Sequence, residues 1–422
     1  MSASQSKMYG TFAGLDVGTE KVSCAIGRLK YDEESTSPQI LLAGFGQRAS
    51  RGVNLSGISD MEALEDTILN AVYAAEESAQ RNVKEVYVNI PASLIQTRKV
   101  MTSLSLSGQN PIQAGHIRKL LSLSRDVQID ENQYIIHVWP LSYTLDDMVN
   151  IKDPIGMIGR ELSALCHVVI ASRSYIKNLT HCIGRCNLDV AGVVADSYAV
   201  GLACLTNDEA ELGATIVDIG GKSTQIACFN RGDMVGLWNV PVGGYHITSD
   251  LARGLSTTLS QAERMKSLYG SLTLEDKNSA EQVPVTQVGQ AGPNINYVPK
   301  QVIYDIIKAR VDSIFDHVLT HMVNASKEIN PVIFQKILLT GGACQMQGIL
   351  ELSHARFDAN VRLAPQVGIL GQNSVLQTLS FSTCAGLLHY AVQDQTGQVR
   401  DKRARTFWQR LAAWLADYRA PV

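Results

Sequence analysis

The chain contains one sequence pattern twice, at positions 202 residues apart. The segments GLDVGT (14–19) and VDIGGKST (217–224) each place an aspartate at the end of an apolar run and follow it with glycine and hydroxyl residues. A second apolar run comes after each segment, so each predicts a β-hairpin with a glycine-containing turn, over 11–29 and 214–229. Two matching hairpins imply two domains of similar construction, which restricts the fold more than any other feature of the sequence.

The turns of both hairpins have a composition that suits phosphate binding. Glycine lets the backbone approach an anion closely, and successive N–H groups in such a turn form an anion-binding concavity. Asp16 and Asp218 cannot bind phosphate themselves, but they can hold Mg²⁺ through its waters. Either segment alone could be an ordinary hairpin turn. Together with a third glycine pair, Gly341 and Gly342, after the apolar run 336–340, they favour two loops that hold a nucleotide between two domains.

A different nucleotide motif is partly present in the second segment. Residues 221–223 (GKS) match the end of a P-loop, but the first glycine of that motif would fall at Ile216. A P-loop also opens a helix, whereas TQIACF (224–229) has the composition of a strand. The sequence therefore predicts that this segment is not a P-loop.

Length and composition exclude several classes of protein. A chain of 422 residues, 45% of them apolar and 18% charged, predicts two or three globular units. The net charge of −3 argues against a nucleic-acid binder. No apolar run reaches 18 residues and the first ten residues are polar, so we expect neither a membrane-spanning helix nor a signal peptide. The eight cysteines form no C-x-x-C pair, which favours free buried thiols over a zinc site.

Apolar periodicity outlines the remaining elements. Helical spacing is found over 59–81, 173–187, 248–269 and 300–323, and short strand-like runs over 86–90, 134–140, 189–194 and 336–340. The segment 271–299 is polar and turn-rich and predicts a mobile loop. Strands that alternate with helices indicate an α/β fold with mixed sheets.

Seven segments of the chain resemble the FtsA family of bacterial cell-division proteins, a branch of the actin/sugar-kinase/heat-shock-protein superfamily of ATP-binding proteins. They are GLDVGTEKV (14–22), HVWPLSYTLD (137–146), DPIGMIGREL (153–162), ELGATIVDIGG (211–221), VPVGGYHITSDLA (240–252), QAERMKSLYG (261–270) and LTGGACQMQGI (339–349). The HVWP and DPIGM motifs are specific to this branch, because general actin-like proteins and sugar kinases lack them.

The resemblance implies an actin-like two-domain fold, with ATP in the interdomain cleft and an inserted subdomain of the 1C type. Subdomain 1A would comprise 8–86 and 171–202, with 378–392 returning to it, and the insertion would be 87–170. Subdomain 2A would comprise 203–245 and 329–377, and subdomain 2B 246–328. A flexible linker (393–405) and an amphipathic helix (406–419) would follow.

The resemblance also assigns the nucleotide-binding residues. The first phosphate loop would be Asp16, Gly18 and Thr19, and the second Asp218, Gly220, Gly221 and Ser223, with Lys222 beside them. Glu263 and Lys266 would face the ribose and adenine, and Gly341 and Gly342 would lie beneath the adenosine. The implied cofactors are ATP and Mg²⁺, the latter held through water by Asp16 and Asp218. No catalytic residue is assigned, and the resemblance implies at most weak ATPase activity.

The sequence departs from the family pattern at three places near these loops. Lys222 stands where a third glycine is usual. If that position needs a positive φ, lysine costs roughly 1 kcal/mol or more; alternatively, its ammonium contacts the phosphates. GGAC (341–344) lacks a further glycine, and Asp196-Ser197 replaces a more usual Glu-Pro.

The end of the chain has the pattern of an amphipathic helix. In FWQRLAAWLADY (407–418) the apolar residues occupy one arc of about 120°. They are Phe407, Trp408, Leu411, Trp414, Leu415 and Tyr418. Arg410 and Arg419 flank that arc, and the segment before it is polar and basic. A helix docked on its own core would show the same face, but the basic segment favours an anchor at an anionic membrane surface.

These features together predict an ATP-binding, self-polymerising membrane tether of the bacterial division ring. The resemblance implies that it anchors the tubulin-like protein FtsZ through the FtsZ C-terminal peptide, at the cytoplasmic face of the inner membrane at midcell. Lys300 and Arg310 are candidates for contacting that peptide, with ordinary surface charge as the equal alternative. The insertion would contact later division proteins and neighbouring subunits, and no nucleic acid is expected.

Two other functions remain as alternatives. A small-molecule kinase of the same fold would need a positioned general base, and no distinct motif supplies one. An actin-fold ATPase of another membrane machine, such as pilus assembly, is disfavoured by HVWP, DPIGM and the tail.

Overall fold

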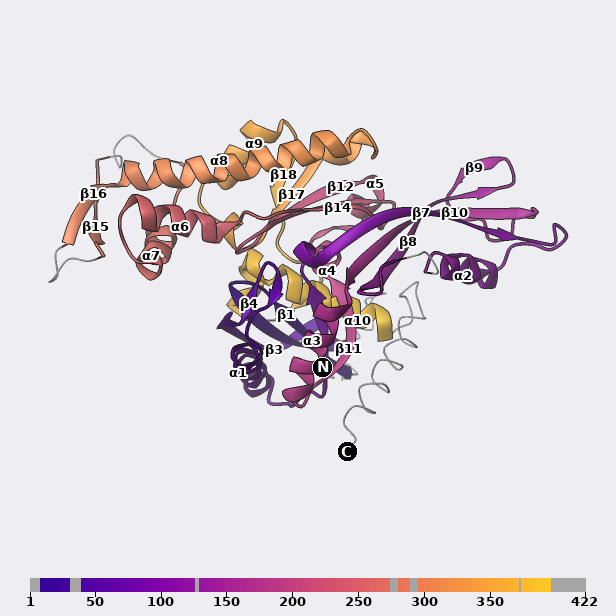
Figure 1. Ribbon diagram of the computed structural model, residues 1–422, viewed down its shortest axis with the longest axis horizontal. Coiled ribbons are helices and arrows are strands. Elements are labelled where there is room, and N and C mark those ends of the chain that lie inside the picture. Colours follow the sequence, from indigo (N-terminus) through magenta and orange to yellow (C-terminus); the bar gives the residue numbers. More distant parts are fainter. Residues whose placement is uncertain are drawn as a thin grey trace, which may run out of the picture.

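The computed structural model describes residues 8–30, 39–125, 129–273, 280–288, 295–371 and 373–395 (Figure 1). The first domain contains a six-stranded sheet. Its strands, in spatial order, are β11 (Asp189–Ala195), β6 (Glu85–Ile90), β1 (Met8–Val17), β2 (Lys21–Lys30), β3 (Gln39–Ala49) and β19 (Ile369–Leu370). The second domain contains a five-stranded sheet. Its strands are β14 (Asp233–Val240), β13 (Thr224–Asn230), β12 (Ala214–Ile219), β17 (Lys336–Thr340) and β18 (Asn360–Leu363).

The two sheets repeat one topology, which confirms the two predicted hairpins. β1 pairs antiparallel with β2 and parallel with β6, and β12 pairs antiparallel with β13 and parallel with β17. The register is also the same: Asp16 lies opposite Ser23, and Asp218 lies opposite Gln225. The offset of 202 residues therefore holds across both hairpins. Because β13 is a strand, the segment after Gly221 is not a P-loop.

Helices cover the first sheet because its strands are apolar on both faces. α1 (Met61–Ala79) begins at Asp60, whose side chain accepts a hydrogen bond from the Ala63 N–H, and packs on β2 and β3. Its buried residues Leu64, Ile68, Ala71 and Ala75 recur at the spacing of one helical face. The other helices of this domain are α3 (Arg173–Arg185), α4 (Asp196–Cys204) and α10 (Ser382–Gln395). α10 packs against α4, β1 and β2. Near the end of its described part, the chain therefore comes back to the first domain and contributes to its core.

The upper part of the second domain is built mainly from helices. It contains α6 (Gly244–Gly254), α7 (Leu259–Tyr269), α8 (Lys300–Ala325) and the hairpin of β15 (Gln282–Thr286) and β16 (Ile295–Pro299), with α9 (Ile349–Phe357) beside α8. α8 runs along the top of Figure 1.

Two predictions for this part of the chain differ from the structure. The helical spacing over 248–269 covers two helices, because α7 starts anew at the Thr258 cap. The described part of 271–299 forms a hairpin instead of only a loop.

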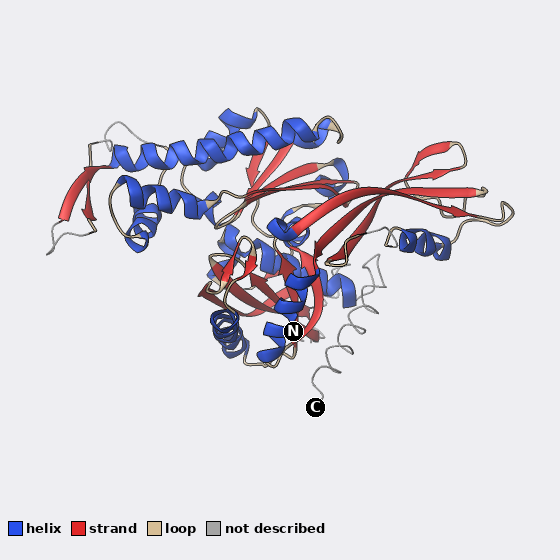
Figure 2. Cartoon of the chain, in the orientation of Figure 1, coloured by secondary structure: helices blue, strands red, loops and turns tan. Residues whose placement is uncertain are grey.

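The insertion is a separate small sheet with its own core. Its strands are β7 (Ile95–Ser105), β10 (Glu161–Ser172), β8 (Gln133–Leu145) and β9 (Met148–Ile151), all antiparallel. One helix, α2 (Ala114–Leu123), packs on β7 and β10. Figure 2 shows this unit as mostly strand, with α2 below it. Leu120, Leu145 and Leu162 are fully buried between the helix and the sheet.

Three predicted boundaries are moved by the structure. β6 lies in the first sheet between β11 and β1, so the insertion begins after Ile90 rather than at 87. The chain reaches the first sheet again at β19, before residue 378. α10 extends to Gln395, three residues into the predicted linker. The amphipathic segment 406–419 lies outside the described residues.

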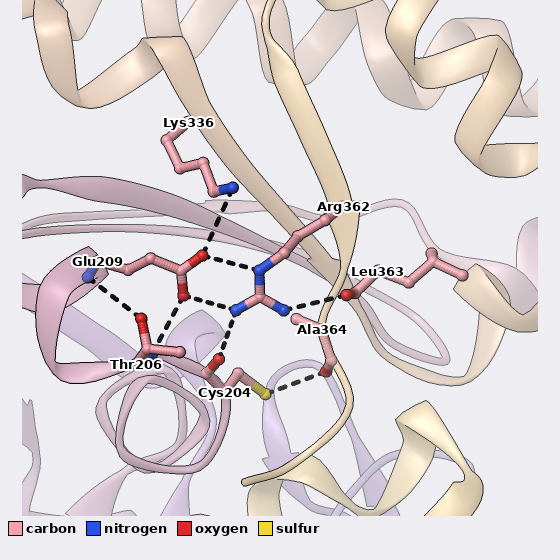
Figure 3. A network of polar contacts seen from close by, with 7 residues as sticks. All are labelled: Cys204, Thr206, Glu209, Lys336, Arg362, Leu363 and Ala364. Atoms are coloured by element: carbon pink, nitrogen blue, oxygen red, sulfur yellow. Dashed lines mark hydrogen bonds and ion pairs between the residues drawn. The ribbon is translucent and has the colours of Figure 1, made fainter.

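The two connections between the domains are joined by a polar network (Figure 3). Arg362 at the end of β18 donates two hydrogen bonds to Glu209 of α5 (Asn207–Leu212), from Nε to Oε1 at 2.8 Å and from Nη2 to Oε2 at 2.6 Å. Arg362 also binds the Cys204 carbonyl oxygen at 2.9 Å. These contacts from Arg362 hold the pKa of Glu209 down at about 2. At neutral pH the pair is fully charged, which fixes one interdomain connection against the other.

All eight cysteines are free and buried. This confirms the expectation of unpaired thiols.

Candidate functional site

A cavity of about 720 Å³ lies between the two domains. The ends of β1 and β12, the hairpin turns, α7 and the turn after β17 all contribute to its wall. It brings together every predicted nucleotide-binding residue except Lys222. Those lining it are Asp16, Gly18, Thr19, Asp218, Gly220, Gly221, Ser223, Glu263, Lys266, Gly341 and Gly342.

The two hairpin turns have the same internal hydrogen bond. The Gly18 N–H donates to the Lys21 carbonyl at 3.0 Å, and the Gly220 N–H donates to the Ser223 carbonyl at 3.0 Å. The carbonyls of Gly220 and Gly221 accept hydrogen bonds from the first two N–H groups of α6, at 2.9 and 2.8 Å. Because the N–H of a trans peptide points opposite to its C=O, the N–H groups of Gly221 and Lys222 point away from α6. Two successive N–H groups on one side form an anion-binding turn.

Lys222 adopts this turn without backbone strain. It is not among the described non-glycine residues with positive φ, so the predicted cost of replacing a third glycine does not arise. Its ammonium does not line the cavity: Nζ lies 3.5 Å from Glu20 Oε1 and 5.1 Å from the centre of the Tyr245 ring.

Asp16 is held in place at the end of β1 by a buried amide. Asn89 of β6 donates from Nδ2 to Asp16 Oδ1 at 3.0 Å and accepts from the Val17 N–H at 2.8 Å. Burial raises the pKa of Asp16, and the nearby Lys21 opposes that effect. Burial also raises the pKa of Asp218 to about 6, and the charge of Asp16 adds to the shift. Two carboxylates that repel each other across a cavity favour a bound cation.

Asp196 is a third carboxylate in this wall. It begins α4, is almost fully buried, and accepts hydrogen bonds from the Ser197 N–H at 2.7 Å and from Gln225 Nε2. Burial raises its pKa to about 8, assisted by the charges of Asp218 and Asp16. The sequence revealed Asp196 only as a departure from the family pattern. An acidic residue directly after a buried strand was the signal that could have identified it as part of the site.

The acidic residues fit a hydrated Mg²⁺ ion better than a fully protein-coordinated metal. Among the described residues, no group of three or more His, Cys, Asp or Glu side chains could hold a metal ion directly. Mg²⁺ keeps several waters and binds through one or two carboxylates together with phosphate oxygens. Asp16 and Asp218 suit that role because both face the cavity and their charges repel.

Glu263 and Lys266 form an ion pair on α7, with Nζ 2.6 Å from Oε2. Lys266 Nζ also donates to the Gly244 carbonyl at 3.2 Å and to Thr248 Oγ1 at 2.8 Å, so it links α7 to the start of α6. The pair is therefore more than a solvated helix face: it holds two walls of the cavity together.

The HVWP motif supports the cavity from the insertion. His137 Nε2 accepts a hydrogen bond from the Ala195 N–H at 3.1 Å, next to Asp196, and its ring stacks on Trp139 with centroids 4.8 Å apart. Burial lowers the pKa of His137 to about 3, so the ring is neutral and can accept. In the same sheet, His167 Nδ1 lies 2.8 Å from the Met234 carbonyl oxygen of the second domain. The insertion therefore contacts both domains beside the cavity.

Gly341 is expected to be irreplaceable, whereas its neighbour Gly342 is not. Gly341 has a φ of +93°, and a Cβ there would lie 2.2 Å from Asp218 Oδ1. We expect Gly341→Ala to lower the free energy of unfolding by about 1–3 kcal/mol through backbone strain and to displace Asp218. A Cβ at Gly342 would have Ser380 Cβ as its nearest neighbour, at 3.9 Å, so Gly342→Ala is the matched control. Urea unfolding of both variants measures the difference, and equal stabilities would contradict the expectation.

Lys300 and Arg310 both have partners within the second domain. Lys300 Nζ lies 3.3 Å from Glu281 Oε2, and Arg310 Nε lies 2.6 Å from Asp250 Oδ2. A contact with an acidic peptide remains a prediction for both.

The residues predicted to bind membrane, 407–418, lie outside the described residues. Within the described part of the chain, no helix is long and apolar enough to cross a membrane.

Comparisons with known proteins agree with the architecture. The family described as "Cell division protein FtsA" matches residues 215–386, and the family described as "SHS2 domain inserted in FTSA" matches residues 93–170. The cell division protein FtsA of Rhizobium meliloti (strain 1021) is 34% identical over 391 residues, which cover 91% of this chain and 88% of that protein. That of Neisseria meningitidis serogroup B is 30% identical over 413 residues, covering 96% and 97%.

Two solved structures share the fold at low sequence identity. One is a PilM–PilN type IV pilus biogenesis complex, with a TM-score of 0.63, 14% identity and coverage of 90% of this chain and 98% of that chain. The other is MreB5 of Spiroplasma citri bound to AMPPNP, with a TM-score of 0.54, 14% identity and coverage of 92% and 97%. These similarities show an actin-like fold. With the similarity to full-length relatives and the matching insertion, they lead to one conclusion: the chain belongs to the FtsA family of cell division proteins.

Proposed function

We propose that this protein is an ATP-binding, self-polymerising tether that anchors FtsZ to the inner membrane at the division site. The observation that carries the proposal is the pair of equivalent Asp–Gly turns on one interdomain cavity, in a chain of the FtsA family. Two turns with the same hydrogen bond, each after an apolar strand that ends in aspartate, suit the phosphates of one nucleotide.

ATP with Mg²⁺ is the proposed occupant of the cavity. The N–H group of Gly221, which lines the cavity, would bind a phosphate oxygen, and Asp16 and Asp218 would hold the waters of Mg²⁺. The ion would supply charge neutralisation for the phosphates. Lys266 and Glu263 line the cavity away from the turns and would meet the ribose and adenine. ATP turnover would be weak, because the proposed role needs a bound nucleotide more than rapid hydrolysis.

Partner binding would be divided among the other parts of the chain. The FtsZ peptide would bind the upper part of the second domain, near α8. The insertion would contact later division proteins and neighbouring subunits, and residues 406–419 would bind the cytoplasmic face of the membrane. The likeness to a pilus protein concerns the fold alone, whereas the sequence similarity over most of the chain is to FtsA relatives, so pilus assembly is the weaker candidate. A small-molecule kinase is weaker still, since membership of the FtsA family speaks against it.

A synthetic peptide of the C-terminus of the cognate FtsZ is expected to bind the purified full-length chain with micromolar affinity, which corresponds to about −8 kcal/mol. Fluorescence anisotropy of the labelled peptide measures this binding. A peptide of the same composition in scrambled order is the control. Equal affinity for the two peptides, or none for either, would argue against the tether.

A second pair of variants locates the peptide. Lys300→Gln removes a cation from the start of α8, and Lys177→Gln removes one from α3 of the first domain. A loss confined to Lys300→Gln would support the predicted contact, and equal affinities would assign Lys300 to its ion pair with Glu281 alone.

A further inference from the structure

We propose that Lys222 is a triphosphate-sensing residue, which exchanges its partner Glu20 for the terminal phosphate of a bound nucleoside triphosphate. The site would then prefer a triphosphate to a diphosphate. The inference rests on the proposed nucleotide site and adds to it the residue that distinguishes the two ligands.

The first observation is that Glu20 and Lys222 occupy equivalent positions of the two turns. They are 202 residues apart, as are Asp16 and Asp218. The turns face each other on one cavity, so equivalent positions meet across it. At this position the two domains carry opposite charges, and Lys222 Nζ lies 3.5 Å from Glu20 Oε1.

The second observation is that the two turns touch where this ion pair forms. A Cβ at Gly221 would lie 2.2 Å from Glu20 Cγ, so only glycine lets Glu20 lie against the second turn. The ammonium of Lys222 also lies over the Tyr245 ring, at 5.1 Å from its centre. Lys222 is thus held at the rim of the cavity by a carboxylate and an aromatic face, both of which are displaceable partners.

The third observation is the position of the pair relative to the cavity and solvent. Glu20 lines the cavity, whereas Lys222 does not. The side chains of Lys222 and Glu20 are 28% and 45% exposed, and ion pairs with such exposure are weak. A pair of this kind holds the lysine without preventing its release.

A bound triphosphate would change which group attracts the Lys222 ammonium most strongly. Its terminal phosphate would bring negative charge between turns that already carry Asp16, Asp218 and Glu20. That charge repels the Glu20 carboxylate and attracts the Lys222 ammonium, which reaches a new position by rotation of its flexible side chain. A diphosphate lacks the terminal group and leaves the pair with Glu20 in place. Lys222 therefore adds affinity for the triphosphate only.

The test measures the affinities of Mg-AMPPNP and Mg-ADP for the full-length chain by isothermal titration calorimetry. Lys222→Gln is expected to weaken AMPPNP binding about tenfold, the usual cost of losing a hydrogen bond to a charged group, and to change ADP binding less than about twofold. Glu20→Gln removes the competitor and is expected to strengthen AMPPNP binding about threefold. In the Lys222→Gln background, Glu20→Gln should have a smaller effect, because it then relieves only the repulsion between the Glu20 carboxylate and the terminal phosphate. Lys84→Gln, an exposed lysine before β6, is the matched control.

The outcomes separate this inference from the proposed function. If the unchanged protein binds both nucleotides and Lys222→Gln leaves the ratio of the two affinities unaltered, the sensing role is wrong and the nucleotide site stands. An equal loss for both ligands would also overturn sensing, because it indicates a structural role for the lysine. If the unchanged protein binds neither nucleotide, both proposals fail.

Discussion

Removal of residues 406–422 is expected to abolish co-sedimentation of the protein with vesicles of anionic lipid. The removed segment carries six apolar residues on one predicted helical face, and burial of such side chains contributes several kcal/mol at about 25 cal/mol per Å². The basic residues at 400, 402, 403 and 405 remain, and each contributes roughly 1 kcal/mol near an anionic surface. Charge alone gives weak, salt-sensitive binding, so we expect at least about a hundredfold loss of membrane affinity.

Two substitutions of equal charge distinguish a membrane-binding face from general attraction. Trp414→Glu places a carboxylate on the predicted apolar face, and Gln409→Glu places one on the opposite face. We expect the first to reduce binding as strongly as the truncation and the second to reduce it only slightly. Persistence of full binding in the truncated protein would refute the anchor.

Replacement of Asp218 by alanine is expected to lower the affinity for Mg-ATP by about 10–100-fold, as loss of an outer-shell metal partner commonly does. The protein should remain folded. The pKa of Asp218 is about 6 in the folded chain, above its ordinary value of 3.8, so its stabilising protonated form is lost as the pH rises through 6. At pH 7.5 the buried charge is unfavourable, and its removal should leave the melting temperature unchanged or higher.

The matched control for this experiment is Asp208→Ala, an exposed aspartate in the first turn of α5. Calorimetric titration with Mg-ATP and thermal unfolding are measured on both variants. Unchanged affinity in Asp218→Ala would contradict the proposed Mg²⁺ site, and a collapse of its thermal transition would show that Asp218 is needed for folding instead.

The spacing of apolar residues was sufficient to predict the helices and strands whose own residues determine which face is buried. The strands 214–219 and 224–229 are apolar on both faces. The structure has the first as β12 with the predicted boundaries and the second as β13, which extends one residue further, to Asn230. The helical spacing over 300–323 became α8 because its buried residues repeat along one face over many turns. Such segments have one way to bury their side chains, so their secondary structure follows from composition.

Elements that depend on contacts with distant residues were harder to predict from the sequence pattern. The spacing over 248–269 runs through the break between α6 and α7, where the Thr258 side chain caps a new helix by binding the Gln261 N–H. The strands β15 and β16 are short, and they form by pairing with each other while Val283 and Val285 bury their side chains in the core of the second domain. The assignment of β6 to the first sheet follows from its place between β11 and β1, which periodicity does not reveal.

The residues of the candidate site also divide into those that the sequence revealed and those that only the structure revealed. Asp16 and Asp218 stood out because the repeat marks them. Asn89 and Asp196 did not, since neither belongs to the repeat, and only folding brings them to the cavity. The HVWP motif signalled a family, and the structure shows its local role: His137 binds the backbone next to Asp196.

The repeat at an offset of 202 residues was enough to predict two similar domains, two turns and the aspartates that end their first strands. Those features are local, because each needs only an apolar strand and a glycine-containing turn. What the repeat could not show is that its equivalent positions meet. Asp16, Asp196 and Asp218 line one cavity, and Glu20 contacts Lys222, because the two domains meet there in the folded chain. Proximity between residues so far apart in sequence is a property of the folded chain alone.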